Sequence, residues 1–192
     1  MDAKDLFKEG LKEADGCVML VENDQLSNDT PCSEWDLRAL LNHMINEISW
    51  IPDLLAGKTI KEVGDKYDGD LVGDDPRKSW KNAADKALKA VESAKHDAKV
   101  HLSYGDVTAD HYIREVGSDL LIHGWDVGQA IKCSVVFDTD VAQAIQEFLA
   151  PHADEYRASG LIGEEIPTQE SDSLHVKLLA FYGRREPEWQ GE

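Results

Sequence analysis

Apolar residues recur every three or four positions along four long stretches of this 192-residue sequence. Residues three or four apart lie on one face of an α-helix, so this period predicts amphipathic helices. The stretches cover residues 2–22, 34–56, 76–96 and 109–131. Each helix must bury its apolar stripe against other elements, which indicates an all-α fold.

Loop signals separate these stretches. Residues 23–31 are rich in Asn, Asp and Ser, and Ser33 with Asp36 three residues later resembles a capping box that starts the second helix. Residues 57–75 hold four glycines among many charges and are too long for a tight helical hairpin. Pro76 suits the first position of the third helix. The sequence therefore predicts a four-helix bundle with a long crossover.

The rest of the chain has weaker patterns. Residues 100–104 alternate enough for a short extended segment, and helices are predicted over 140–156 and 173–182 with a loop at 160–167 between them. The length suits one sizeable hydrophobic core, and no internal repeat divides the chain. We therefore expect a single helical domain over residues 1–192, with short C-terminal helices and minor β segments.

The chain is strongly acidic, with 20 Lys and Arg against 38 Asp and Glu and a net charge of −18. A negative field repels phosphate backbones and anionic lipid surfaces, so neither nucleic acid nor a membrane is an expected partner. The sequence begins without the pattern of a secretory signal and has no run of 18 apolar residues. Its three cysteines, without CxxC spacing, suit reduced thiols. We predict a cytoplasmic protein.

Two ionisable residues mark a candidate metal site on the fourth predicted helix. Asp119 and His123 are four apart, so both side chains lie on one face within one turn. His43, at the edge of the apolar stripe of the second helix, would complete a set of two histidines and one carboxylate with open coordination positions. The spacing alone also fits a solvated ion pair or a core histidine. His111 and Glu115 have the same spacing but point away from the stripe.

Three segments resemble a known family. Residues 30–43, TPCSEWDLRALLNH, are similar to its TPCxxWxxxxLxxH opening, and residues 118–126, SDLLIHGWD, contain its HGWD segment. Residues 183–189, GRREPEW, are similar to the GRxPxW ending of its stand-alone members. From about residue 6 to 189 the chain resembles the DinB-like metal-binding family that includes the N-terminal domain of mycothiol-dependent maleylpyruvate isomerase.

That resemblance implies a fold of four bundled helices and one divalent metal ion, zinc before nickel. The ligands that it implies, carried over position by position, are His43, Asp119 and His123. Asp119 stands where the isomerase has a longer Glu, a change that the metal tolerates more readily than the reaction does. The resemblance also implies a transferase or isomerase that uses a low-molecular-weight thiol, because a metal-bound thiol loses its proton and can attack an electrophilic carbon.

The residues around the site suggest roles and leave alternatives. Glu47, one turn after His43, would move a proton, and Asp126 would support the site. A metal-dependent hydrolase would activate water at the same open position. A non-catalytic metal-binding or stress-response module would use the ion to clamp two helices together. We expect a small-molecule partner, such as a thiol, and the sequence is compatible with a homodimer.

Overall fold

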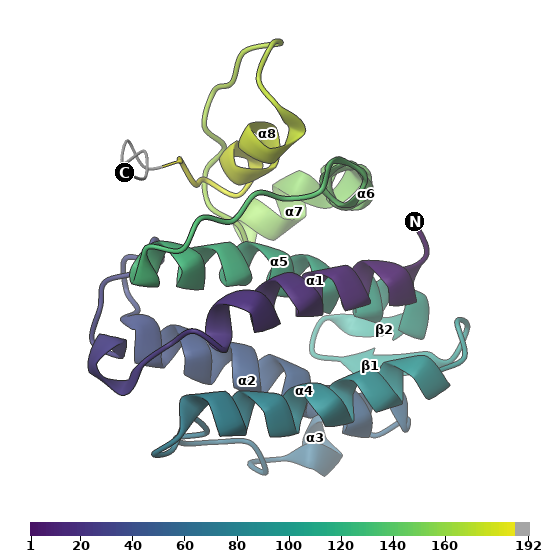
Figure 1. Cartoon of the computed structure of the whole chain (residues 1–192). Helices are drawn as coiled ribbons and strands as arrows, with labels where there is room; N and C mark the ends of the chain where they lie inside the picture. The colour runs from purple at the N-terminus through teal and green to yellow at the C-terminus, as the bar shows by residue number, and fades with distance from the viewer. Residues whose placement is uncertain (187–192) are drawn as a thin grey trace. The chain divides into compact units, whose positions relative to one another are not determined.

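Four long helices form the core of the computed structural model, in which residues 1–186 are described. They are α1 (Ala3–Val18), α2 (Leu37–Leu55), α4 (Pro76–Ser93) and α5 (Ala109–Ile131). Figure 1 shows α1 beside α5 and α2 beside α4, the two pairs that share the most contacts. The largest side chains buried between them include Phe7, Leu40, Trp80, Leu120 and Trp125. The predicted all-α four-helix bundle is confirmed.

The chain divides into two compact units, Asp2–Val135 and a smaller unit that begins at Val136. The four long helices all belong to the larger unit. Within residues 1–186, no helix is both long enough and apolar enough to cross a membrane. The expectation of one domain over residues 1–192 stays a prediction, and the last three residues of the GRREPEW motif lie outside the described part of the chain.

The close packing of α1 on α5 depends on glycines. A Cβ on Gly117 would lie 2.8 Å from the Cα of Phe7, and one on Gly124 would lie 2.9 Å from the Cα of Ala14. No real side chain tolerates such distances to backbone atoms, so both positions require glycine for the helices to approach this closely. This contact fixes the stretch of α5 that carries the predicted metal ligands.

The second helix begins later than predicted, at Leu37. Its N-cap is Asp36 and not Ser33, and the Asp36 carboxylate accepts the backbone N–H three residues on at 2.8 Å. The preceding residues form a turn around Thr30, whose hydroxyl donates to the carbonyl of Trp35 at 2.8 Å. The same oxygen accepts the N–H of Cys32 at 3.1 Å. The TPCxxW segment is therefore a turn in front of the helix, because its backbone groups bond to Thr30.

The crossover between α2 and α4 contains the one-turn helix α3 (Ile60–Val63). Three side chains on either side of α3 donate hydrogen bonds to the carboxylate of Asp53 in α2. Asp53 accepts hydrogen bonds from Lys58 at 2.8 Å, Lys66 at 2.5 Å and the Tyr67 hydroxyl at 2.8 Å. We call these four residues the Asp53 cluster. It ties the start of the crossover to the end of α2.

A β-hairpin connects α4 to α5. Strands β1 (Lys99–Leu102) and β2 (Gly105–Thr108) pair antiparallel, with Val100 opposite Val107. The extended segment predicted at 100–104 thus belongs to a hairpin with a tight turn. The hydroxyl of Thr108 then accepts the N–H of His111 at 3.2 Å and caps the start of α5. The hairpin therefore leads directly into the helix that carries two of the predicted ligands.

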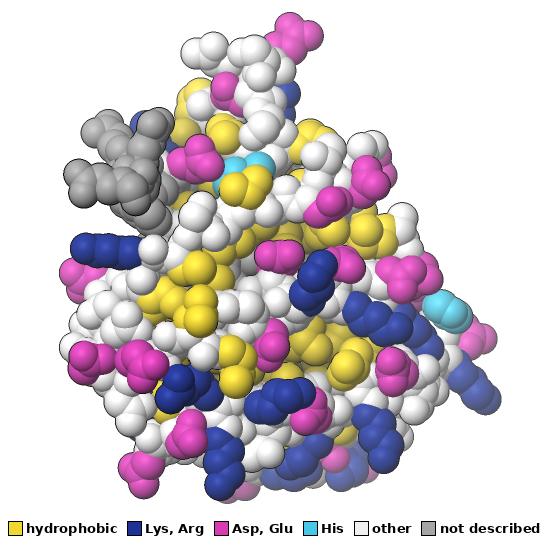
Figure 2. All heavy atoms as spheres, in the orientation of Figure 1, with side chains coloured by type: hydrophobic (Ala, Val, Ile, Leu, Met, Phe, Trp, Pro, Cys, Tyr) yellow, Lys and Arg dark blue, Asp and Glu magenta, His cyan; other side chains and the backbone are white. Residues whose placement is uncertain are grey.

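Charged side chains on the face formed by α1 and α4 are paired with one another. Figure 2 shows Lys, Arg, Asp and Glu interspersed there with exposed apolar side chains. Between the two helices lies a hollow of about 270 Å³ whose lining includes Leu11, Ala84 and Leu88. Lys12 pairs with Glu9 at its rim, and further along Lys81 pairs with Asp85. Positive and negative side chains are therefore mixed on this face, although the chain as a whole carries a large net negative charge.

The smaller unit is also helical, with α6 (Thr139–Leu149), α7 (Ala153–Ala158) and α8 (Leu174–Phe181). The single helix predicted over 140–156 is interrupted at Ala150–His152, because Pro151 has no backbone N–H to continue the helical hydrogen bonds. α6 packs on α8. The N–H of Phe137 donates to Nδ1 of His175 at 3.2 Å, which joins the entry of α6 to α8.

Candidate metal centre

The bundle brings the three predicted ligands together. His43 lies on α2, and Asp119 and His123 lie on successive turns of α5. His43 Nε2 is 3.5 Å from Asp119 Oδ2, and His123 Nε2 is 3.4 Å from Asp119 Oδ1. One donor atom from each residue lies within 4.8 Å of the other two. Donor atoms this close can share one divalent ion at metal–ligand distances of about 2.0–2.2 Å.

One oxygen of Asp119 is shielded from solvent and has no hydrogen-bond partner among the described residues. This atom is Oδ2, although the side chain as a whole is 35% exposed. An unsatisfied buried acceptor costs about 1–3 kcal/mol, and more when it is charged. A cation placed between the three side chains would satisfy it. The residues present therefore fit a divalent metal ion.

The charges of the metal-free centre are strongly coupled. Burial raises the pKa of the Asp119 carboxyl, but His123 and His43 outweigh this effect and hold the pKa well below its usual range. Burial lowers the pKa of His123, but Asp119, Asp126 and Cys32 outweigh it and hold the pKa well above its usual range. Without metal, an ionised Asp119 faces a protonated His123. A metal ion would take the place of that proton.

Asp126 supports His123 from the side opposite Asp119. It is completely buried, and its Oδ2 lies 2.9 Å from Nδ1 of His123. An Nδ1–H that donates to this carboxylate leaves Nε2 as the nitrogen that faces Asp119. A carboxylate of this kind fixes the orientation of a metal-binding imidazole. The structure places Asp126 beside His123, and its supporting role stays a prediction.

Cys32, His123 and Asp126 form a second group of candidate ligands. This group uses Nδ1 of His123 in place of Nε2. Its members are already bonded to one another, since Asp126 Oδ2 accepts from the Cys32 thiol at 3.3 Å as well as from His123. Asp119 Oδ2, by contrast, has no such partner. The group of His43, Asp119 and His123 is therefore the better candidate for a metal site.

Glu47 is half-buried on α2, one turn after His43. Burial raises the pKa of its carboxyl, and the negative charge of Asp119 adds to this shift, while the two site histidines act in the opposite direction. A carboxyl group with a raised pKa is suited to proton transfer near neutral pH. The charges of all three candidate ligands shift the pKa of Glu47, so its carboxyl lies close to the candidate metal centre.

The centre is open to solvent on the side of His43. The side chain of His43 is 27% exposed, whereas that of His123 is 9% exposed. Trp35 lies beside both, with ring centroids 4.7 Å from His43 and 6.1 Å from His123. The sequence analysis assigned no role to Trp35 or Cys32. The signal that could have found them was their position in the motif directly before the helix that carries His43.

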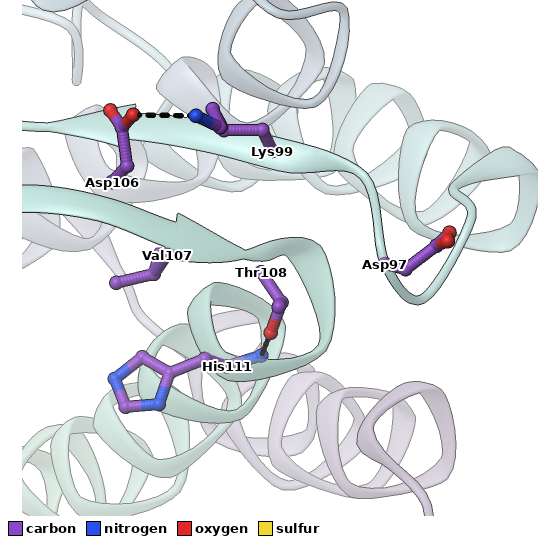
Figure 3. A pocket seen from close by; sticks show the side chains of 6 residues that line it. All are labelled: Asp97, Lys99, Asp106, Val107, Thr108 and His111. Carbon is purple, nitrogen blue, oxygen red and sulfur yellow. Dashed lines mark hydrogen bonds and ion pairs between the residues drawn. The ribbon is translucent and has the colours of Figure 1, made fainter.

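A hollow of about 510 Å³ lies apart from these ligands, beside the hairpin and the start of α5 (Figure 3). It is lined by Asp97, Lys99, Asp106, Val107, Thr108 and His111. Lys99 and Asp106 form an ion pair at 3.0 Å, and His111 lies 3.3 Å from Glu115. None of the predicted ligands lines this hollow, so it is not the candidate centre.

The fold and the site define a class of protein: a helical bundle with two histidines and one carboxylate from facing helices around an open position. The family model of the mycothiol maleylpyruvate isomerase N-terminal domain matches residues 7–128. This range contains all three candidate ligands together with Glu47 and Asp126. The chain belongs to the mycothiol maleylpyruvate isomerase N-terminal domain family.

Individual relatives extend this similarity over most of the chain. Uncharacterized proteins from two strains of Mycobacterium tuberculosis are each 27% identical over 176 residues, which covers 85% of this chain and 87% of the relative. Crystal structures of mycothiol-dependent maleylpyruvate isomerase and of a histidine mutant match with a TM-score of 0.69 and 16% identity. They cover 95% of this chain and 88% of the isomerase, so the shared fold includes most of the smaller unit.

Proposed function

We propose that this protein binds one divalent metal ion through His43, Asp119 and His123 and catalyses a thiol-dependent transfer or isomerisation. The observation that carries the proposal is the Asp119 carboxylate, which has an imidazole nitrogen beside each oxygen and no hydrogen bond at Oδ2. Membership of a family named after a mycothiol-using isomerase supports the thiol and the reaction class. Two imidazoles and one carboxylate suit zinc first and nickel second.

The proposed reaction needs a Lewis acid to bind the thiol and a side chain to accept the thiol's proton. A divalent ion at this site would supply a Lewis acid at which a low-molecular-weight thiol becomes a nucleophilic thiolate. Asp126 holds His123 in the orientation that the centre needs. Glu47 takes up the proton that the thiol loses, which its place one turn from His43 and its raised pKa support. Trp35, whose ring lies beside both histidines, would line the position of a small electrophilic substrate.

The exposure of the ligands supports a catalytic site over a structural clamp. A structural zinc site is closed, with four protein ligands, whereas a catalytic one keeps a position for substrate. The described residues supply three ligands to this group, and two of them are partly exposed. The same open position would also suit a hydrolase. Only a measurement of the reaction can distinguish hydrolysis from thiol-dependent transfer or isomerisation.

Elemental analysis of protein purified without chelators or a His-tag tests the metal. We expect close to one zinc or nickel per chain for wild type and a loss of metal in His43→Ala and His123→Ala. His111→Ala is the matched control, because it removes a histidine of α5 outside the centre and should retain the metal. A wild-type protein that carries no metal and gains no thermal stability from Zn²⁺ or Ni²⁺ would refute the proposal.

A substrate panel with and without added thiol then tests the reaction. Turnover that requires the thiol supports transfer or isomerisation, whereas turnover without it supports hydrolysis. Glu47→Gln should retain the metal and lose about 10²–10⁴-fold in turnover, the range expected for a general base. Full activity of Glu47→Gln would exclude Glu47 as the proton acceptor.

A further inference from the structure

We propose that Cys32 is a positioning residue of this centre, which acts through Asp126 on the metal-binding ring of His123. The inference rests on the proposed metal site and adds a residue to it. The Cys32 thiol donates to Asp126 Oδ2 at 3.3 Å, and its sulfur lies 3.9 Å from His123 Nδ1. Asp126 Oδ2 thus receives two donors, the thiol of Cys32 and the Nδ1–H of His123.

The fold holds Cys32 in this place from two sides. The hydroxyl of Thr30 accepts the N–H of Cys32 and lies 3.1 Å from its carbonyl, so the turn fixes the cysteine backbone. Further back, the side-chain amide of Asn28 donates to the carbonyl of Ala130 at 2.8 Å. This bond anchors the loop before the turn to the end of α5, the helix that also carries Asp126.

Because Asp126 is buried, loss of the hydrogen bond from the Cys32 thiol should change how Asp126 holds His123. Asp126 has no exposure to solvent, so water cannot readily replace a donor that is removed. A buried carboxylate with fewer donors is freer to rotate. Rotation weakens its hold on Nδ1 of His123, and the opposite nitrogen, Nε2, is then aimed less well at the metal. Cys32 therefore orients a ligand without being one.

The size of the effect follows from this indirect role. Loss of a residue that directly supports a metal-binding histidine costs about 10–100-fold in metal affinity. Cys32 acts one hydrogen bond further from the metal than Asp126 does. We therefore expect its loss to weaken metal binding by about tenfold, the lower end of that range.

Competition for Zn²⁺ against a chromophoric chelator tests the proposal on the full chain. Cys32→Ala and Cys32→Val both remove the donor, and each should bind Zn²⁺ about tenfold more weakly than wild type. Cys32→Ser keeps a donor at the same position and should restore most of the affinity. Cys133→Ala, which removes another half-buried cysteine outside the centre, should bind like wild type. The Val variant keeps the test decisive should the Ala variant fail to fold.

A second measurement needs no metal. In ¹H–¹⁵N spectra of the imidazole groups, the Nδ1–H of His123 should exchange slowly in wild type and Cys32→Ser and faster in Cys32→Ala and Cys32→Val. Unchanged Zn²⁺ affinity and unchanged exchange in the Ala and Val variants would overturn the role of Cys32 and leave the metal site standing. A wild type that binds no Zn²⁺ would instead refute the proposed function, and the exchange rates would still decide whether Cys32 positions His123.

Discussion

Two carboxylates of the larger unit, Asp53 and Asp119, have similar electrostatics and different surroundings. Interactions with neighbouring groups hold the pKa of both well below the usual range. Both oxygens of Asp53 accept hydrogen bonds from lysines or a tyrosine. Asp119 has two histidines as neighbours and one oxygen without a hydrogen bond.

The two carboxylates differ in whether the protein satisfies their oxygens. The lysines of the Asp53 cluster are permanent cations that come from the adjacent crossover, so this carboxylate is fully satisfied by its own chain. The histidines beside Asp119 are candidate metal ligands, which lysines are not. A low pKa therefore does not by itself identify a functional site. The oxygen without a hydrogen bond and the two imidazoles beside the carboxylate distinguish Asp119.

The largest expected contrast is in metal affinity. Asp119→Ala removes a direct ligand and should weaken Zn²⁺ binding by more than about 100-fold, beyond the cost of losing a supporting residue. Asp53→Ala should leave the affinity unchanged, because the Asp53 cluster lies outside the candidate ligand set. Chelator competition on both variants measures this contrast. Equal Zn²⁺ affinities of Asp119→Ala and Asp53→Ala would show that Asp119 is not a metal ligand.

The next contrast is in the stability of the metal-free protein. Asp53→Ala leaves the tyrosine and both lysines of its cluster without their acceptor, and we expect a loss of about 1–2 kcal/mol in the free energy of unfolding. Asp70→Ala is the control, because the pair of Asp70 with Arg38 is exposed to solvent and should contribute less to stability than the Asp53 cluster. Urea unfolding measures both. A loss from Asp53→Ala no larger than the control would mean that the cluster does not stabilise the crossover.

The smallest contrast is in the pH dependence of stability. Because the pKa of Asp53 is lower in the folded state, its contribution is present above the unfolded pKa of about 3.9 and is lost as the pH falls below it. The stability difference between wild type and Asp53→Asn should therefore shrink between about pH 5 and pH 3. Urea unfolding across this range measures it. A difference that stays constant would show that the charge of Asp53 is not what stabilises the crossover.

Periodic features of the fold were predictable from the sequence, and so was the placement of two candidate ligands on one face of α5. The apolar period predicts the four long helices, and residues four apart on α5 must share a face, which is why Asp119 and His123 could be paired. His43 was a candidate from its place at the edge of the apolar stripe of the second helix, and the resemblance to a family motif supported it, since sequence spacing says nothing about its distance from α5.

Features that depend on irregular backbone could not be predicted in the same way. The start of α2 at Leu37 depends on a turn whose hydrogen bonds to Thr30 outweigh the capping signal of Ser33. That turn also places Cys32 against Asp126, a contact between residues 94 positions apart. The Asp53 cluster likewise forms only once the crossover folds back on α2. Such contacts have no local period for a sequence pattern to reveal.

X-ray absorption spectroscopy of the zinc-loaded protein, prepared without added thiol, tests the central claim most directly. A centre built from His43, Asp119 and His123 predicts only nitrogen and oxygen neighbours at about 2.0–2.2 Å, with the scattering pattern of two imidazoles. A sulfur neighbour at about 2.3 Å would show that the metal binds a cysteine, and would contradict the assignment of the centre to Asp119 and the two histidines.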